Sequence, residues 1–336
     1  MTAIGMDIGH SAVKLSFQSP NKPDGEITHL SFPATAIPSF MIQDDAERKL
    51  SLLDHVMVPS TAQHGEGSFF TGDTAITHGS QSVTGLHFDW IKTAEHSALI
   101  MAAKRKLDQY GVRQENRFVV LGLPVSSFGA QKDILRQIAQ TLMPASTIKV
   151  VIQPIAALHA ELLDAEGNSI PGRSFADESW AVVDIGHFTT DIVAIENGRF
   201  QPRKSDSCRG VFKACEALTQ ILALGNIPDV TMVEAEKCLH TNQIKNWGQT
   251  TDITSQCNEA KQTIINEISD MATRLLSDGA RQRTGTLLTG GGASILHAHI
   301  KSIWPNTKTS DFGRFTVSEG MRRMASAAIN AQAAQS

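Results

Sequence analysis

Four residues, Asp-Ile-Gly-His, occur twice in this chain, at 7–10 and again at 184–187. Each copy lies between two apolar, β-branched runs, a pattern that predicts a strand, a tight turn and a second strand. One repeated tetrapeptide can arise by chance. The repetition of strand, turn and strand around it favours two related lobes.

The length of 336 residues also favours two domains, because single cores rarely grow that large. We place lobe I at residues 1–163, with a small inserted subdomain at about 32–90. Lobe II spans 164–315, with an insert at about 211–275. A C-terminal helix at about 316–332 is expected to pack back on lobe I.

Strand and helix patterns alternate along the chain, which predicts an α/β fold. Apolar, β-branched runs predict strands at 2–8, 12–18, 68–71, 117–123, 147–152, 180–185, 190–196 and 285–289. Helical spacing of apolar residues predicts helices at 94–110, 129–142, 154–164, 211–224 and 254–278.

Composition describes an ordinary globular protein, with 41% hydrophobic and 19% charged residues and a net charge of -4. The lack of a basic excess argues against direct nucleic-acid binding. We expect no membrane span and a cytoplasmic location, because no run reaches roughly 20 apolar residues and the start has no signal-peptide pattern. The four cysteines lack metal-ligand spacing, so we expect buried free thiols.

The first turn has the residues of a phosphate site. Gly9 permits the bend, His10 and Ser11 offer amides or a hydroxyl, and Lys14 offers a positive charge. Asp7 repels phosphate, so a divalent cation such as Mg²⁺ has to lie between them. An ordinary β-turn with a solvated Asp7 is the alternative.

The second copy strengthens the phosphate interpretation. Asp184 ends a strand, Gly186 lies in the turn and Thr189 offers a hydroxyl. Two such hairpins could clamp one triphosphate and its cation. A third element, LLTGGGASIL at 287–296, predicts a strand, a glycine loop and a helix start near a nucleoside. Neither a P-loop nor a dinucleotide-binding glycine motif occurs in the sequence.

Together these segments resemble the superfamily of two-lobed ATPases that includes actin, heat-shock chaperones and sugar kinases. The resemblance rests on MDIGHSAVK (6–14), VIQPIAALHAE (151–161), VVDIGHFTTDIV (182–193), CNEAKQTI (257–264) and LLTGGGASIL. The segment DSCRGVFKACEAL (206–218) is most similar to the bacterial plasmid-segregation actins, the ParM/StbA family. This resemblance implies an actin-like fold, each lobe with a duplicated ribonuclease-H-like sheet flanked by helices, and a nucleotide in the central cleft.

The resemblance also implies roles for individual residues. Asp7 and Asp184 hold Mg²⁺ through water, Lys14 contacts the β-phosphate, and Gln153 orients the attacking water. A neutral amide is a poor base, which predicts slow hydrolysis. The residues expected to bind nucleotide are Gly9, His10, Ser11, Lys14, Gly186, His187, Thr189 and Gly210, with Asn258, Lys261, Gln262, Gly290, Gly291 and Gly292 around the adenosine.

Several of these residues have simpler interpretations. His10 and His187 stand where many relatives have Gly, Ser or Thr, and His187 is more readily a turn residue than a base. Lys261 could be part of a solvated helix face, and Gln153 a helix-start residue. Gln262 replaces an arginine that stacks on the base in chaperones, which leaves ATP or GTP preference open.

As a function, the resemblance implies an ATPase that polymerises head to tail with nucleotide in a bacterial cytoplasm. It implies plasmid segregation through a small DNA-binding adaptor bound to a centromere-like site. A small-molecule, sugar-type kinase is the alternative, which we disfavour because Asp191 is expected to point into the strand and away from the cleft. A non-polymerising ATP-dependent scaffold is a further alternative.

Overall fold

The structure is a computed structural model and describes residues 1–20, 25–79 and 89–335. The chain forms two compact units. The first comprises Met1–Ser174 and Phe315–Ser336, and the second Phe175–Arg314. The first unit therefore extends beyond residue 163, where we place the end of lobe I.

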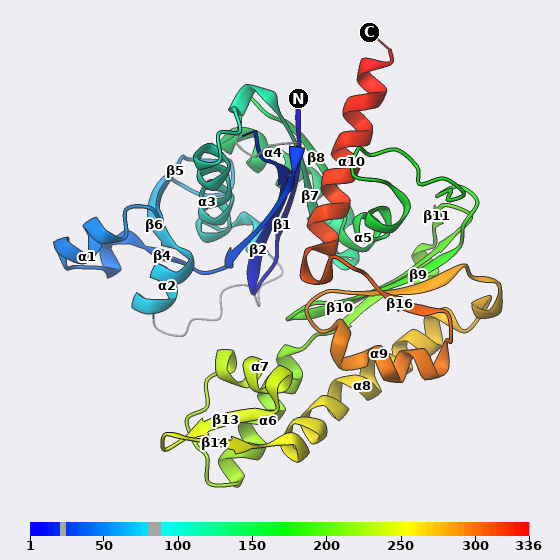
Figure 1. The fold of residues 1–336 in the computed structure, drawn as a ribbon. Helices are drawn as coiled ribbons and strands as arrows, with labels where there is room; N and C mark the ends of the chain where they lie inside the picture. The colour runs from blue at the N-terminus through cyan, green and yellow to red at the C-terminus, as the bar shows by residue number, and fades with distance from the viewer. Residues whose placement is uncertain (21–24, 80–88, 336) are drawn as a thin grey trace. The chain divides into compact units, whose positions relative to one another are not determined.

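The first unit is built on a mixed sheet with the strand order β3-β2-β1-β7-β8 (Figure 1). Strand β1 (Thr2–Ile8) pairs antiparallel with β2 (Ala12–Gln18), and β2 continues to β3 (Ile27–Pro33). On its other side β1 pairs parallel with β7 (Arg117–Leu123), which pairs parallel with β8 (Thr147–Ile152). With β2 on one side and β7 on the other, β1 has a central, buried position.

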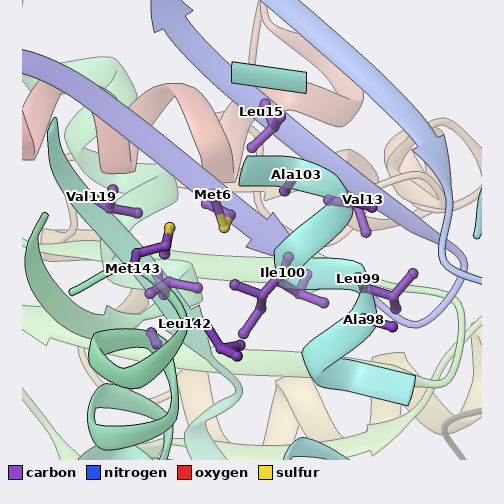
Figure 2. Close-up of a cluster of buried hydrophobic side chains, with 14 of the residues drawn as sticks. Met6, Val13, Leu15, Ala98, Leu99, Ile100, Ala103, Val119, Leu142 and Met143 are labelled. Atoms are coloured by element: carbon purple, nitrogen blue, oxygen red, sulfur yellow. The ribbon is translucent and has the colours of Figure 1, made fainter. Parts of the chain in front are cut away.

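Helices α3 (Ala94–Gln109) and α4 (Val125–Leu142) cover one face of this sheet. Helix α4 begins earlier than the predicted residue 129, and the carbonyl of its N-cap residue Pro124 accepts a hydrogen bond from the amide of Phe128. The core between sheet and helices is drawn in Figure 2, where side chains from the strands meet those of the helices: Met6, Val13, Leu15, Val119, Ala98, Leu99, Ile100, Ala103, Leu142 and Met143.

Helices α10 (Thr316–Ala333) and α5 (Gln153–Leu162) pack together, and α10 also packs on β1 and β7. Glycines make this packing possible. A Cβ atom on Gly5 would lie 1.8 Å from the carbonyl oxygen of Ser318, and one on Gly320 would lie 1.7 Å from that of Ala156. The backbone of α10 therefore approaches both β1 and α5 as closely as backbones can pack.

A buried charge cluster on α10 explains where the first unit ends. Glu319 accepts hydrogen bonds from Arg322 and Arg323. Arg322 also donates to the carbonyl of Ala165, and Arg323 to that of Ala160. Burial by itself raises the pKa of Glu319, but the two arginines hold it below its ordinary value. These bonds fix the segment after α5 to the first unit.

The predicted insert of the first unit contains a small sheet of order β4-β6-β5. It is made of β4 (Ala36–Pro38), β5 (His55–Val58) and β6 (Gly67–Thr71), with helices α1 (Asp45–Leu50) and α2 (Gly72–His78) beside it. Residues 80–88 of the predicted insert lie outside the described residues.

The second unit repeats the arrangement of a hairpin beside two parallel strands. Strand β9 (Trp180–Ile185) pairs antiparallel with β10 (Thr189–Glu196) and parallel with β15 (Gly285–Thr289), which pairs parallel with β16 (Thr307–Thr309). Strands β11 (Arg199–Phe200) and β12 (Asp206–Arg209) both pair antiparallel with β10. The α/β layers that the sequence predicts are therefore present in both units.

Helices α6 (Phe212–Leu224), α8 (Thr254–Leu276) and α9 (Ala293–Ile303) share the core of the second unit with its sheet. Between α6 and α8 lie α7 (Met232–Thr241) and a hairpin of β13 (Gln243–Asn246) and β14 (Gln249–Asp252). The predicted strands and helices do not include these three elements.

The sequence predicts that the four cysteines are buried free thiols. Cys215, Cys238 and Cys257 are buried free thiols as predicted, while Cys208 is half-buried. Burial raises the pKa of Cys215 to about 12.

Within residues 1–20, 25–79 and 89–335, no helix has the length and apolar character needed to cross a membrane.

Candidate functional site

The first hairpin places Asp7 and Lys14 opposite each other. They are partners in the β1–β2 register, and Lys14 Nζ lies 2.9 Å from Asp7 Oδ2. Asp7 is 2% exposed. A carboxylate this buried needs a charged or hydrogen-bonded partner, and the cross-strand lysine provides it.

Gln153, the first residue of α5, reaches the same carboxylate. Its Nε2 donates a hydrogen bond of 2.8 Å to Asp7 Oδ1. Gly122 on β7 makes room for it, because a Cβ there would lie 2.7 Å from Gln153 Cγ and 2.1 Å from Met321 Cε. Asp7, Lys14 and Gln153 thus form one hydrogen-bonded group.

The turn of the first hairpin is closed by the amide of Gly9, which donates to the carbonyl of Ala12. The ring of His10 stacks on Trp90, with 4.4 Å between ring centroids and 25° between planes. Trp90 in turn meets His96 edge-on. Burial, with smaller effects from His10 and His64, lowers the pKa of His96 to about 3, so this ring is neutral at physiological pH.

The second hairpin repeats the backbone of the first with a different charge pattern. Gly186 donates to the carbonyl of Thr189, as Gly9 does to Ala12. In the β9–β10 register the partner of Asp184 is Asp191, where the first hairpin has Lys14. Cross-strand partners share a face of the sheet, so Asp191 lies on the same face as Asp184.

Four polar residues form a row across this sheet. Ser207 on β12 pairs with Asp191, Asp191 with Asp184, and Asp184 with Thr289 on β15. Ser207 Oγ donates to Asp191 Oδ1. The residue Thr289 is only 2% exposed, and its hydroxyl has no hydrogen-bond partner among residues 1–20, 25–79 and 89–335. A buried, unsatisfied hydroxyl beside the Asp184 carboxylate is suited to a ligand that brings its own polar atoms.

Hydrogen bonds from the backbone at the start of α6 hold the turn between β9 and β10 in place. The carbonyls of Gly186, His187 and Phe188 accept hydrogen bonds from the amides of residues 210–212. A Cβ on Gly210 would lie 2.3 Å from the Gly186 carbonyl oxygen, so only glycine fits there. Because a trans peptide points its N–H away from the preceding carbonyl, the amides of His187 and Phe188 face the opposite side of the turn. Such a run of amides is an anion-binding arrangement.

The glycine run at 290–292 lies at the end of β15. Gly290 has a φ of +85°, and a Cβ on it would lie 2.7 Å from Asp184 Oδ1. Gly292 donates to the carbonyl of Ile185 and packs against that side chain. Gly291 is exposed, with open space around it. Two of the three glycines are therefore needed to bring this loop against the carboxylate of Asp184.

The predicted adenosine residues on α8 have other contacts. Lys261 Nζ donates to Asn242 Oδ1 at the end of α7, and Gln262 donates to Asn266 within α8. Asn258 is exposed. Neither hydrogen bond reaches residues 290–292, so the adenosine role of these three residues stays a prediction.

Some partners of the predicted residues were not identified from the sequence. Asp191 follows Asp184 at the spacing by which Lys14 follows Asp7, and this equal spacing could have identified it as the cross-strand partner of Asp184. Thr289 directly precedes the glycine run. Trp90 and Glu236, which contacts His187, carry no such signal because their contacts join segments distant in the sequence.

Comparison with known proteins gives a consistent result. The family model described as the N-terminal domain of actin-like proteins matches residues 5–151, and that of the C-terminal part of the archaeal actin homologue MreB-like matches 182–302. No curated protein sequence matches the chain.

Solved structures share the fold at low sequence identity. The actin-like protein Alp7A has 15% identity and a TM-score of 0.72, covering 99% of this chain and 97% of its own. The archaeal actin homologue Ta0583, in complex with ADP, has 19% identity and a TM-score of 0.67, with 100% of both chains covered. ParM from a 15-stranded Clostridium botulinum filament has 16% identity and a TM-score of 0.65, covering 96% of this chain and 98% of its own.

The fold class that the sequence predicts is confirmed by these likenesses. Both family models describe actin-like proteins, and they match most of each of the two units. The chain belongs to the actin-like superfamily and has a ParM-like fold.

Proposed function

We propose that this chain is an ATPase that binds a magnesium nucleotide through its two acidic hairpins and forms nucleotide-dependent filaments. The observation that carries the proposal is the repeated hairpin, in which a strand-end aspartate is followed by a glycine turn with the same backbone hydrogen bond. The amides of His187 and Phe188 support phosphate binding at the second hairpin. The ADP in Ta0583 supports an adenine nucleotide as the ligand.

Beside the first hairpin, Gln153 is the residue that we assign to hydrolysis. Its Nε2 is engaged by Asp7, so its Oε1 is the atom that can accept a hydrogen bond from the attacking water. Lys14 is placed to offset phosphate charge once the nucleotide is bound. An amide can orient water but cannot take its proton, so turnover should be slow.

The donor set suits a magnesium ion. Asp184 and Asp191 are adjacent carboxylates, and the buried Thr289 hydroxyl beside them has no partner in the described residues. Oxygen ligands and retained waters are what Mg²⁺ prefers. We propose Asp184 and Asp7 as its carboxylates, acting through water. Bound there, the ion would offset charge on the phosphate oxygens.

Filament formation and its biological use are further parts of the proposal. The filament of ParM from Clostridium botulinum supports self-association of a chain with this fold, and we propose that the contact is head to tail. A heterologous contact that does not close produces an open polymer. We propose that the polymer moves plasmid DNA through a small DNA-binding adaptor, in keeping with the net charge of -4.

Sedimentation with different nucleotides tests the proposal. The purified chain is centrifuged with ATP, with GTP, with a non-hydrolysable ATP analogue, with ADP and without nucleotide, each in Mg²⁺. We expect a pellet with the triphosphates and none with ADP, and slow phosphate release with ATP. A chain that binds no nucleotide in Mg²⁺ would contradict the proposal entirely. A chain that binds ATP yet never pellets would remove the filament part alone.

The position of Asp191 keeps a second candidate function open. Because Asp191 lies on the same face of the sheet as Asp184, it could activate a substrate hydroxyl in a small-molecule kinase. Phosphate transfer measured with a panel of sugars distinguishes the two functions. ATP turnover that depends on a sugar would favour the kinase, and turnover that rises with polymer would favour the filament.

A further inference from the structure

The proposed function uses a backbone amide of His187 but neither of the imidazole rings that end the two Asp-Ile-Gly-His copies. The two histidines have different partners. His10 stacks on the apolar ring of Trp90. His187 meets a carboxylate, that of Glu236 on α7. The second hairpin is therefore linked through this side-chain contact to residues 231–252, the segment that contains α7 and the β13–β14 hairpin.

The contact between His187 and Glu236 is close and partly shielded from water. Nδ1 of His187 lies 3.2 Å from Oε2 of Glu236, and the two side chains are 12% and 35% exposed. The contact is an ion pair when His187 is protonated. The ring also packs edge-on against Phe188 and Phe212, at centroid distances of 4.6 Å and 5.6 Å.

Glu236 is kept ionised by its surroundings. Burial by itself raises the pKa of this carboxyl, but His187, and then His240 and Arg314, lower it overall. A carboxylate therefore faces His187 at neutral pH. Cys215 on α6 is also near Glu236, with its thiol neutral because burial raises its pKa.

The backbone of His187 is fixed independently of its ring. Its carbonyl accepts a 2.7 Å hydrogen bond from the amide of Phe212, and those of Gly186 and Phe188 are held in the same way. The orientation of the imidazole ring depends instead on its contacts with Glu236, Phe188 and Phe212.

We infer that Glu236 is a positioning residue for phosphate binding, which holds the imidazole of His187 toward the phosphate of a bound nucleotide. This inference rests on the proposed nucleotide function. With Nδ1 turned to Glu236, a protonated His187 can donate from Nε2 to a phosphate oxygen, next to the amides of His187 and Phe188. Phosphate bound at the turn then strengthens the contact between His187 and Glu236 on α7. The attachment of residues 231–252 to the second hairpin therefore depends on whether nucleotide is bound.

A double-mutant cycle tests the inference with MgADP, which binds without hydrolysis. The variants are Glu236→Gln, His187→Gln and the two combined, and the quantity measured is the Kd by titration calorimetry. We expect each single variant to bind roughly tenfold more weakly. The double variant should bind no more weakly than His187→Gln alone, because Glu236 acts through the ring.

The matched control is Glu234→Gln, which removes the same charge from the same helix at a residue bonded through its backbone to Thr231. It should bind MgADP as the wild type does. Glu236→Asp, which keeps the charge on a shorter side chain, should recover part of the affinity. Glu236→Gln binding as tightly as Glu234→Gln overturns the inference, as do single-variant effects that simply add.

A measurement on the wild-type chain keeps the test decisive if Glu236→Gln does not fold. The ¹⁵N shifts of the His187 ring should change when MgADP is added, and an unchanged ring signal in a nucleotide-saturated sample overturns the inference. If the wild type binds no MgADP, the proposed function fails. If it binds MgADP and only the Glu236 effects are absent, the inference alone fails.

Discussion

Asp191 lies directly opposite Asp184 in the β9–β10 ladder, in the place that Lys14 occupies opposite Asp7 in the β1–β2 ladder. The two hairpins share their backbone and differ in charge. In the first unit the aspartate has a lysine 2.9 Å away. In the second unit two carboxylates are neighbours, and like charges directly opposite each other are destabilising unless a cation or proton offsets them.

Asp191→Asn should therefore separate stability from magnesium binding. We expect the free energy of unfolding without Mg²⁺ to stay equal or rise by up to about 1 kcal/mol, because a like-charge pair is removed. MgATP affinity should fall roughly tenfold. Denaturant unfolding and nucleotide titration measure the two quantities. Asp270→Asn, an exposed acid on α8, is the control, and equal MgATP affinity in the two variants would show that Asp191 does not contribute to magnesium binding.

Gln153→Ala should uncouple nucleotide binding from hydrolysis. The hydrogen bond from its Nε2 to Asp7 is lost, and with it the amide oxygen that orients water. We expect ATP affinity within about threefold of wild type and phosphate release at least tenfold slower, since positioning contributes that much to such steps. Phosphate release and filament lifetime are the measurements. Unchanged release would remove Gln153 from its role.

Gly122→Ala tests whether the space beside Gln153 is needed for stability and for phosphate release. The added methyl group would lie 2.7 Å from Gln153 Cγ and 2.1 Å from Met321 Cε. We expect a loss of about 1–3 kcal/mol in the free energy of unfolding and slower phosphate release as Gln153 moves. Gly129→Ala on α4 is the matched control, because nothing lies within 4 Å of its Cβ position and alanine favours a helix by up to about 1 kcal/mol. Equal stability of the two variants would contradict the prediction.

His96 should make the chain less stable in acid. Its pKa falls from an ordinary 6.5 to about 3, so between these pH values the unfolded chain binds a proton that the folded chain excludes. Stability from this group is therefore present above pH 6.5 and is lost as pH falls toward 3, by at most about 1.4 kcal/mol per pH unit.

The measurement is urea unfolding at pH 7, 6 and 5 for wild type and His96→Gln. The variant should lose less stability than wild type over this interval, whatever its stability at pH 7. His240→Gln, at an exposed position on α7, should lose as much as wild type. If the free energy of unfolding falls equally between pH 7 and 5 for wild type and His96→Gln, the buried ring of His96 is not the cause of the loss of stability in acid.

Much of the fold could be predicted because its signals are local. The strands on either side of Gly9 and Gly186 follow from short apolar runs, and the turns follow from the glycines. The missed elements have weak local signals. Helix α7 is short, and the β13–β14 turn uses Trp247 at a φ of +48°, a conformation that its residue type does not favour.

The sequence by itself determined which residues carry the chemistry of the hairpins: a strand-end aspartate, a turn glycine and, in the first copy, Lys14. The tertiary structure alone decided their partners. Gln153 meets Asp7, Thr289 lies beside Asp184, and Glu236 meets His187. The reason is that turn and strand propensities act over a few residues, whereas these contacts depend on parallel strand pairing and helix packing between segments distant in the chain.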